Sequence, residues 1–350
     1  MNLALMDKDF NIVKYINFIN LQWIRRYYEP GEFNVQLPAS EYDSSAVYLF
    51  TKDRPELGLI QKRQYADGYD GKVMQLSGYF YEYKLNDKIT YPRFTASGNI
   101  EAIARLIIST YKEDIPILQL GEANDPLLGG SITKESTGDG LATVIYELLQ
   151  TQELSIRCLY DYVNNSMSAI IWQGKDRTQD QDVNSFVVFS EGFRNMQNEE
   201  IIIDNSNFKN YAVVIGNGRY EEGNQIEVIV DLRSSKNIYA QKLYVDQTGQ
   251  TYDETKQTLD EFREQLRQAG IEELAKYTDI TSVSFDTIDR GLTYMKDYDL
   301  GDKCDIVLGS IGESYTVRII EVTEVFKENK HTISLQFGNK VPTVYNKARR

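Results

Sequence analysis

The apolar residues Phe33, Val35 and Leu37 alternate with asparagine and glutamine in the stretch EFNVQLP. A period of two places the three apolar side chains on one face, which predicts a strand with one buried side. Pro30-Gly31 precedes this strand and suits the central positions of a type II turn, because proline presets φ and glycine accepts a positive φ. We therefore expect a hairpin here.

The arm before this turn, LQWIRRYY at 21–28, carries apolar or aromatic residues on both of its faces. It also holds two adjacent arginines, so it combines large contact area with charge. We expect the arm to pack between two surfaces.

Alternating runs separated by turn signals predict a mostly β region over residues 1–95. Turn signals in this region include Asp67-Gly68 and Asp70-Gly71. The β pattern returns from residue 185, for example in the alternating run IEVIVD at 226–231.

Two helices are predicted between these regions. Ile100, Ile103 and Ile107 recur at helical spacing and follow Asn99, a residue type favoured at the N-cap. A second apolar stripe predicts a helix over 139–151.

The longest helix is expected over 253–277, with Phe262 and Leu266 in its apolar stripe and charged residues on the outer face. Gly270 lies inside this pattern. Because glycine weakens a helix interior, we expect Gly270 to break the helix or to end its first part.

This order of elements predicts a β-rich α+β fold with two barrel-like β domains, an α/β insert and a helical insert. A chain of 350 residues also exceeds the usual size of one core. The expected divisions are a first barrel-like β domain at 1–95, an α/β insert at 96–184, a second barrel-like β domain at 185–250 and 278–342, a helical insert at 251–277 and a frayed basic tail at 343–350. The two β halves are similar in architecture without a repeat in the sequence.

The composition disfavours tight binding of nucleic acid. The net charge is −14, whereas a nucleic-acid groove needs lysine and arginine to release phosphate counterions. An acidic surface suits a lumen through which DNA slides. The 25 tyrosines fit half-buried contact surfaces, including subunit interfaces, or simply a high strand content, and both explanations are open.

Cys158 and Cys304 are too few for a disulfide framework or a thiolate metal site. The first residues, MNLALMDKDF, contain acids where a signal peptide has a basic region, and no apolar run has membrane-spanning length. We expect synthesis and folding in a reducing cytoplasm.

Few residues suggest chemistry. The single histidine, His331, excludes triads and histidine metal clusters and is expected to be an exposed turn residue. The glycine-rich stretch at 216–223 is read as a hairpin turn, because its spacing and Glu221-Glu222 do not suit phosphate. We predict no catalytic residues, no cofactor and no metal site.

The acidic residues suggest two further kinds of site, a calcium loop and a glycosidase carboxylate pair. Asp176, Asp180 and Asp182 lack the glycine and closing glutamate of a calcium loop and are expected in a solvated loop. A glycosidase needs only two close carboxylates, and 52 acidic residues leave that possibility open, although no pair stands out.

Several short motifs follow one another along nearly the whole chain. In order, they are RRYYEPGEFNVQLP at 25–38, SGY at 77–79, GNIEAIAR at 98–105, GDGL at 138–141, GKDRT at 174–178, NFKNYA at 207–212, DYDLGD at 297–302, IIEVTEV at 319–325 and FG at 337–338. Together these motifs resemble the siphophage baseplate-hub proteins, the amino-terminal hub module of tail-associated (Tal-type) proteins of phages and prophages.

The resemblance implies a virion structural protein without enzymatic activity, located at the tail tip and similar to the hub ring proteins of contractile-phage baseplates. Such hubs form a homotrimer ring with pseudo-sixfold symmetry that continues or closes the tail tube. It implies contacts with distal tail, tube and tape-measure proteins, and DNA that passes without specific binding. The residues expected at an interface between subunits or between domains are Trp23, Arg25, Arg26, Tyr27, Tyr28 and Phe33. Burial of this arm in an internal barrel core is the open alternative.

Two other functions are open from the sequence. The first is a carbohydrate-active enzyme or a cell-wall binding module acting at the host surface. The second is a free bacterial binding protein. The mass of the protein in solution would separate a ring from both alternatives.

Overall fold

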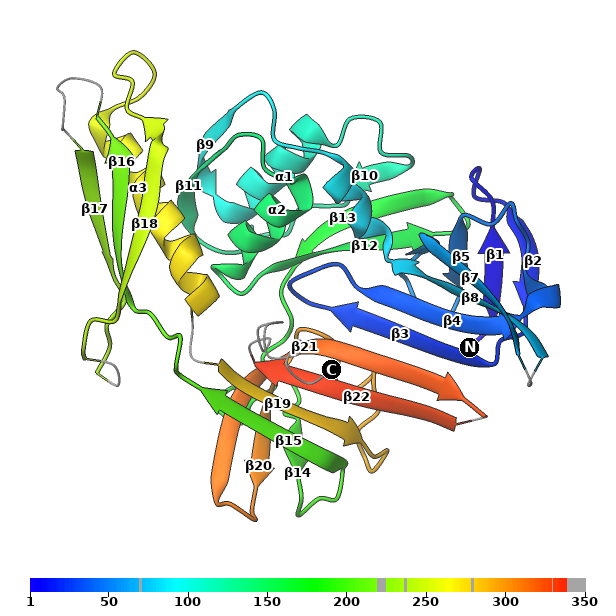
Figure 1. Cartoon of the computed structure of the whole chain (residues 1–350). Coiled ribbons are helices and arrows are strands. Elements are labelled where there is room, and N and C mark those ends of the chain that lie inside the picture. Colours follow the sequence, from blue (N-terminus) through cyan, green and yellow to red (C-terminus); the bar gives the residue numbers. More distant parts are fainter. Residues whose placement is uncertain (69–70, 219–224, 236–237, 278–279, 329, 339–350) are drawn as a thin grey trace.

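A computed structural model describes residues 1–68, 71–218, 225–235, 238–277, 280–328 and 330–338. In these residues the dominant feature is a ten-stranded sheet built from both ends of the chain (Figure 1). Eight of its strands follow one another in the order β15-β19-β22-β21-β3-β4-β8-β7, and every neighbouring pair is antiparallel. Their bounds are β3 Asn20–Arg26, β4 Glu32–Pro38, β7 Lys62–Gly68, β8 Gly71–Tyr79, β15 Met196–Asp204, β19 Ile280–Thr287, β21 Glu313–Lys327 and β22 Lys330–Gly338.

The path divides into two four-stranded units with the same connectivity, each of which is called a quarter below. In the amino-terminal quarter, the four strands lie side by side as β3-β4-β8-β7, which is first, second, fourth and third in their own order along the chain. In the carboxyl-terminal quarter, the same order gives β15-β19-β22-β21. The quarters join where β3 pairs with β21, with Arg26 opposite Glu321 and Asn20 opposite Lys327. This agrees with the expectation of two similar halves.

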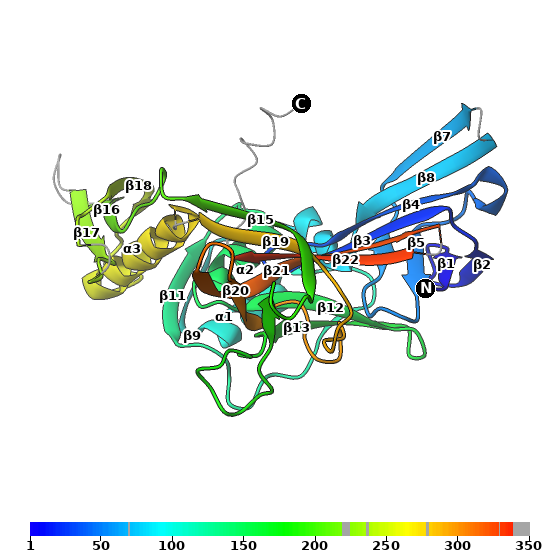
Figure 2. The same cartoon turned by 90° about the horizontal axis from the view of Figure 1, so that it is seen from below.

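One face of the sheet is covered by further strands (Figure 2). The sheet β2-β1-β5-β6 covers the amino-terminal quarter, and Trp23, Phe33 and Leu5 are buried between the two layers. The strands β14 and β20, which also join the sheet beside β21, belong to the carboxyl-terminal region, where Phe189 packs against Phe285 and Phe337. The bounds are β1 Leu3–Met6, β2 Ile12–Ile16, β5 Tyr48–Thr51, β6 Gly58–Leu59, β14 Val188–Ser190 and β20 Lys303–Leu308.

An α/β unit follows β8 in the chain. Its helices α1 and α2 share a core with residues of β1 and β5, so the unit is packed onto the amino-terminal region. The expected cap is confirmed, because Asn99 Oδ1 accepts from the amides of Glu101 (2.9 Å) and Ala102 (3.3 Å). The bounds are β9 Phe94–Asn99, α1 Ile100–Tyr111, β10 Leu118–Leu120, β11 Ser131–Ser136, α2 Leu141–Gln150, β12 Ser155–Asp161 and β13 Ser166–Trp172.

The strands β16 Tyr211–Asn217, β17 Gln225–Asp231 and β18 Lys242–Thr251 form a separate sheet under α3 Leu259–Leu274. The sequence predicts these strands in the second β domain and only the helix in an insert. The three strands instead pair with one another and not with the main sheet. Apolar residues on one face of this small sheet pack against α3. The division into domains otherwise stays a prediction.

Two glycines behave differently from the sequence expectation. Helix α3 runs through Gly270, where a Cβ atom would lie 2.6 Å from Val214 and 2.7 Å from Val230. Gly31 has no left-handed φ, so the type II turn is wrong; a Cβ there would meet the Ile24 carbonyl oxygen at 2.5 Å and the Phe80 ring at 2.6 Å. Both glycines serve close packing instead.

The β-rich α+β class is confirmed by these elements. Short 3-10 helices occur at η1 Ala39–Glu41, η2 Tyr81–Asp87 and η3 Ala275–Tyr277. None of the helices in the described ranges combines the length and apolar character that a membrane crossing requires. The expected basic tail at 343–350 lies outside the described residues.

Candidate functional site

Trp23 and Phe33, two of the predicted interface residues, lie in the core of the amino-terminal region. Both are almost fully buried, and their rings are 6.3 Å apart. Trp23 also contacts Phe80, with ring centroids 4.6 Å apart. The alternation in β3 and β4 places them on the covered face of the sheet.

Arg25 joins distant parts of the chain on the same covered face. Only 3% of the residue is exposed. Its Nε donates to Glu56 Oε1 at 2.7 Å, and its terminal nitrogen donates to Tyr294 Oη at 2.7 Å and to Asp299 Oδ1 at 2.6 Å. Charge-assisted hydrogen bonds of this length are strong when they are shielded from water. Arg25 therefore ties β3 to the loop before β20.

Arg26 points to the opposite, uncovered face and crosses the joint between the quarters. It donates to Glu321 of β21 at 2.8 Å and to Glu32 of β4 at 2.6 Å. Burial by itself lowers the pKa of this guanidinium, but hydrogen bonds to Glu32 and Glu321 raise it above the ordinary value. One side chain thus links three neighbouring strands.

Tyr27 and Tyr28 continue the strand into the α/β unit. The buried Tyr27 donates to the Glu153 carbonyl at 2.9 Å, and its ring meets Trp172 edge-on at 5.0 Å. The guanidinium of Arg318 lies 5.3 Å from the Tyr27 ring centroid. These contacts lie within one chain and so describe an interface between its parts. Contact of the six predicted residues with another subunit stays a prediction.

The main sheet ends in two open edges. At one end β7 pairs with β8, at the other β15 pairs with β19, and no other described strand adds to either. Every residue of β7 is exposed, including Tyr65 at 52%, and Ile203 of β15 is 58% exposed. The hairpin of β7 and β8 extends beyond the rest of the sheet in Figure 2. Open edges of this length readily pair with another strand.

The uncovered face of the sheet is polar and rich in amides and hydroxyls. In Figure 2 the other described elements lie on the opposite side of the central strands. Gln75 donates to Asn34 at 2.9 Å on this face, and Gln336 donates to Ser282 at 3.3 Å. Strand alternation and register place these further residues there: Asn20, Gln22, Gln36, Ser77, Ser284, Thr323, Thr332 and Ser334.

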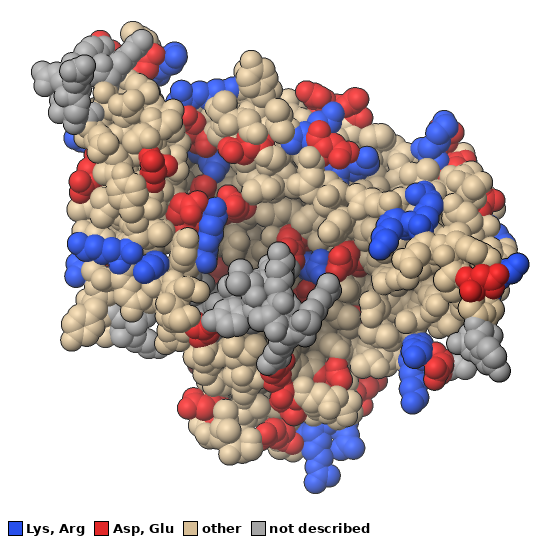
Figure 3. Space-filling view, viewed as in Figure 1, with Lys and Arg blue, Asp and Glu red and all other residues tan. Residues whose placement is uncertain are grey.

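The described residues of this surface show no stripe of charge where Figure 3, which has the viewpoint of Figure 1, displays them: acidic and basic side chains are scattered between broad uncharged areas. The charged residues near the joint, Arg26, Glu32 and Glu321, pair with one another. Among the described residues this surface shows no continuous track of lysine and arginine of the kind that binds nucleic acid.

The predicted turn position of His331 is wrong, because the residue lies in β22 opposite Phe326. The residue is exposed, as predicted. Its side chain is 39% exposed, stacks on Phe326 at 4.1 Å and contacts Glu324 Oε2 through Nε2 at 2.9 Å. Glu324 is buried and also accepts from Arg54 Nε at 2.7 Å.

The remaining acidic and glycine-rich candidates are in loops. Asp176 accepts from the amide of Thr178 at 3.0 Å, and Asp180 and Asp182 are exposed. In the described ranges, no group of three histidine, cysteine or acidic side chains is arranged to hold a metal ion. The predicted hairpin turn at 216–223 lies largely outside the described residues, although its flanking strands β16 and β17 pair antiparallel.

Two of the short sequence motifs contact each other. In the first, GKDRT, Arg177 Nε donates to Asp302 Oδ2 at 2.6 Å, and the Lys175 amide donates to Asp302 Oδ1 at 2.8 Å. Asp302 belongs to the second, DYDLGD. A Cβ atom on Gly174 would lie 1.9 Å from the Gly301 carbonyl oxygen, so the two backbones touch. The motifs together join the end of the α/β unit to β20.

Residues 2–339 match the family described as siphovirus ReqiPepy6 Gp37-like protein. The chain belongs to this family. The expected siphophage affiliation is thereby confirmed. No curated protein matches the chain.

Solved structures share the fold of this Gp37-like chain at low sequence identity. The tail protein from Neisseria meningitidis MC58 has 10% identity and a TM-score of 0.60, with 97% of this chain and 96% of that chain covered. The 43 kDa tail protein of prophage MuSo2 from Shewanella oneidensis has 12% identity and a TM-score of 0.60, with 96% and 98% covered. The prophage tail protein gp18 from Listeria monocytogenes EGD-e has 14% identity and a TM-score of 0.57, with 99% and 98% covered. The Gp37-like chain thus has a fold seen in phage tail proteins.

Sequence reasoning identified the arginines but missed the open edges and the repeated strand order. The alternation of amides with apolar residues was visible in β4 and was a usable signal for the polar face. No comparable signal marks β7 and β15 as edge strands, because the sequence of a strand does not specify which other strands pair with it.

Proposed function

We propose that this protein is the baseplate hub at the tail tip of a siphovirus. Three copies form a ring that continues or closes the tail tube, and the polar sheet face lines the passage. The role is structural and involves no catalysis. The observation that carries the proposal is the repeated strand order of the two quarters, together with the open edges β7 and β15.

The internal joint supplies a template for contact between copies. Inside one chain, the first strand of the amino-terminal quarter (β3) pairs antiparallel with the third strand of the carboxyl-terminal quarter (β21). The strands in the equivalent positions of the opposite quarters are β15, the first strand of the carboxyl-terminal quarter, and β7, the third strand of the amino-terminal quarter. Each has one edge that pairs with no other described strand. Pairing β15 of one copy with β7 of the next repeats the internal joint and gives a head-to-tail interface that closes into a ring.

The strand directions support this pairing. The continuous path holds eight alternating strands, an even number, so β15 and β7 of one chain run in opposite directions. A neighbouring copy related by rotation therefore presents β15 antiparallel to β7. Such a ring is antiparallel throughout, and each copy contributes two equivalent quarters.

The exposed side chains at the edges are placed for burial in this joint. Tyr65 lies opposite Met74 and shares the covered side of the sheet with Leu76, and Ile203 shares that side with Val283. In the internal joint, the equivalent side contains the buried Trp23 and Val322. Burying one such apolar side chain contributes roughly 1.5–3 kcal/mol.

The passage would suit DNA that moves without being held. Amide and hydroxyl side chains hydrogen-bond to one another and offer few cations to phosphate, which limits sequence-independent binding. Other tail proteins would contact the ring at its two ends, and the protein would reside in the virion tail.

The test is the mass of the purified chain in solution, measured by light scattering, with particle images. We expect a trimeric ring. Tyr65→Lys and Ile203→Lys should each give folded single copies, since each places a charge in the joint. The matched controls are Tyr15→Lys and Ile311→Lys, whose side chains are 60% and 59% exposed away from these edges, and both should remain trimeric.

Two results would reject the proposal. One is a wild-type chain that stays single at every accessible concentration. The other is a single-copy chain that releases soluble fragments from cell-wall polysaccharide, which would favour the enzyme alternative.

A further inference from the structure

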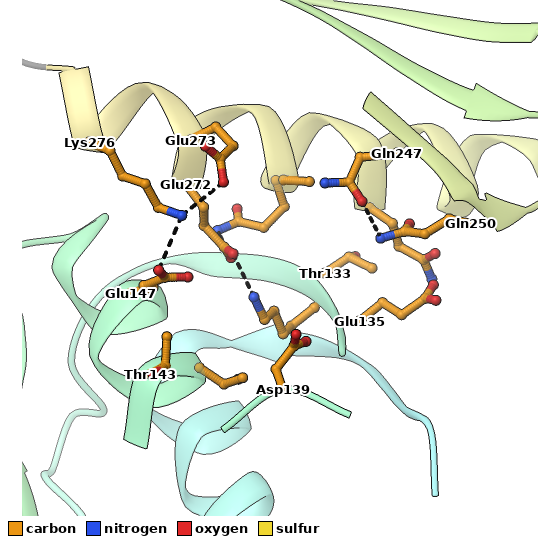
Figure 4. Close-up of a pocket in the computed structure, with 15 residues that line it drawn as sticks. Thr133, Glu135, Asp139, Thr143, Glu147, Gln247, Gln250, Glu272, Glu273 and Lys276 are labelled. Atoms are coloured by element: carbon orange, nitrogen blue, oxygen red, sulfur yellow. Dashed lines mark hydrogen bonds and ion pairs between the residues drawn. The ribbon is translucent and has the colours of Figure 1, made fainter. Parts of the chain in front are cut away.

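A polar cavity lies between α3 with β18 and the α/β unit with β11 and α2 (Figure 4). Its volume is about 360 Å³, which is within the range of small-molecule sites. Helix α3 buries its apolar stripe against the small sheet, so the side that faces the cavity is polar. The cavity lies apart from the edges and the sheet face of the proposed ring.

The lining of the cavity is acidic. It includes five carboxylates, Glu135, Asp139, Glu147, Glu272 and Glu273, and two lysines, Lys134 and Lys276, which gives a formal charge of −3.

Both lysines are already paired. Lys134 Nζ lies 2.5 Å from Glu272 Oε2, with 9% of each side chain exposed. Lys276 lies 2.8 Å from Glu273 and 3.1 Å from Glu147, at the opposite end of the cavity from Gln250 and Glu135 in Figure 4. Neither lysine is left to neutralise Glu135 or Asp139, and Glu135 pairs instead with Arg93.

Three acceptor oxygens of the lining have no partner in the described part of the chain. They are Glu135 Oε2, Gln250 Oε1 and Gln265 Oε1. Gln265 is 4% exposed, and the Glu135 side chain is 7% exposed. A buried acceptor without a partner destabilises a protein, so such groups are rare.

The other ends of these three side chains are fixed. Arg93 lies 2.6 Å from Glu135 Oε1, Gln250 Nε2 donates to Gln247 at 3.0 Å, and Gln265 Nε2 donates to Gln257 at 2.7 Å. These contacts hold each side chain in place and leave one acceptor oxygen of each without a partner. All three side chains line the same cavity, and two of the three acceptors are neutral amides.

We propose that this cavity binds a small organic cation that carries a primary ammonium group. An ammonium has three N–H donors and no acceptor, which matches three unpartnered acceptor oxygens. The negative lining favours a positive ligand, and the volume accommodates an alkyl chain as well as the ammonium. The inference stands independently of the ring.

The test is calorimetric titration of the full chain with n-butylammonium and with 1,4-diaminobutane. We expect saturable binding of both. Tetramethylammonium, which has the charge without N–H donors, should bind at least about tenfold more weakly, since hydrogen bonds to charged groups are worth about 1.5–3 kcal/mol. Calcium chloride is the comparison for a bare metal ion.

Variants locate the binding. Glu135→Gln removes the charge, and Gln265→Met and Gln250→Met remove the amide acceptors. Each should weaken butylammonium binding about tenfold or more. Glu313→Gln changes the net charge by the same amount on an exposed part of β21 and should alter the affinity less than about twofold. Thermal unfolding checks that each variant is folded. If Glu135→Gln does not fold, the two methionine variants decide whether the cavity binds the amine.

Three outcomes would overturn the proposal. The first is the absence of saturable amine binding. The second is calcium binding in preference to amines. The third is amine binding that Gln265→Met and Gln250→Met leave unchanged. None of these outcomes depends on whether the protein forms a ring, so each proposal can fail alone.

Discussion

Arg25 Nε lies 2.7 Å from Glu56 Oε1, and both side chains are shielded from solvent. Removing one member of such a pair leaves the other as an uncompensated buried charge. We predict that Arg25→Met lowers the free energy of unfolding by about 3–5 kcal/mol, as measured by chemical denaturation.

Arg26→Met is the control, because Arg26 makes three ion pairs on the uncovered face, against two for the buried Arg25. Arg26→Met should lower the free energy of unfolding by about 1 kcal/mol or less, because solvent screens the ion pairs on this face. Equal losses for the two variants would contradict the burial argument. Arg25→Glu should give insoluble protein, the outcome expected of a side chain inside the fold.

Glu82 should make stability fall as pH rises. Burial, followed by the charge of Glu56, raises the pKa of Glu82 to about 8, although backbone hydrogen bonds oppose the shift. An unfolded glutamate has a pKa of about 4.3, so between about pH 4 and pH 8 the folded state holds the extra proton. This group therefore lowers the free energy of unfolding by up to about 1.4 kcal/mol per pH unit across that window.

Glu82→Gln is neutral at every pH and removes this loss. The stability difference between Glu82→Gln and wild type should grow from pH 4 to pH 8 and then level off. Denaturant titrations at several pH values measure it, with the exposed Glu313→Gln as the control. Parallel curves for wild type and Glu82→Gln would show that Glu82 does not carry the effect.

Gly270→Ala should destabilise the small sheet and its helix. The new Cβ would lie 2.6 Å from Val214 and 2.7 Å from Val230, and overpacking of this kind costs about 1–3 kcal/mol. The gain in helix propensity, up to about 1 kcal/mol, offsets part of this loss. Adding Val214→Ala should make the effect of Gly270→Ala smaller, and simple additivity in this double-mutant cycle would argue against the contact.

Gly174→Ala should separate the two motifs that join the α/β unit to β20. Here the Cβ would meet backbone, 1.9 Å from the Gly301 carbonyl oxygen, which cannot rotate away. We expect a loss of about 3 kcal/mol in thermal or chemical unfolding. Gly249→Ala has no atom within 4 Å of the new Cβ and should change stability by no more than about 0.5 kcal/mol.

The sequence predicted what depends on neighbours along the chain. Asn99 caps its helix because the amides that it accepts from are two and three residues away. The faces of β4 followed from alternation alone. These features need only the local period and the hydrogen-bonding capacity of one side chain.

Contacts between distant residues could not be predicted in the same way. Arg25 is buried because Glu56 and Asp299 meet it, and these partners are 31 and 274 residues away in the chain. The sequence prediction for Gly31 and Gly270 rests on the conformational freedom of glycine. In the structure their roles depend instead on Phe80, Val214 and Val230, which lie close to where a Cβ atom would be. Local periodicity specifies which face is buried but not which segment buries it.

The joint between β3 and β21 lies inside one polypeptide, so its two strands stay at a fixed effective concentration however far the protein is diluted. In any assembly that repeats this joint between copies, half of the joints would be permanent and half would depend on concentration. A copy released from such an assembly would keep an intact example of the joint. The two kinds of joint can also evolve separately, since a substitution in β3 alters one and a substitution in β15 alters the other.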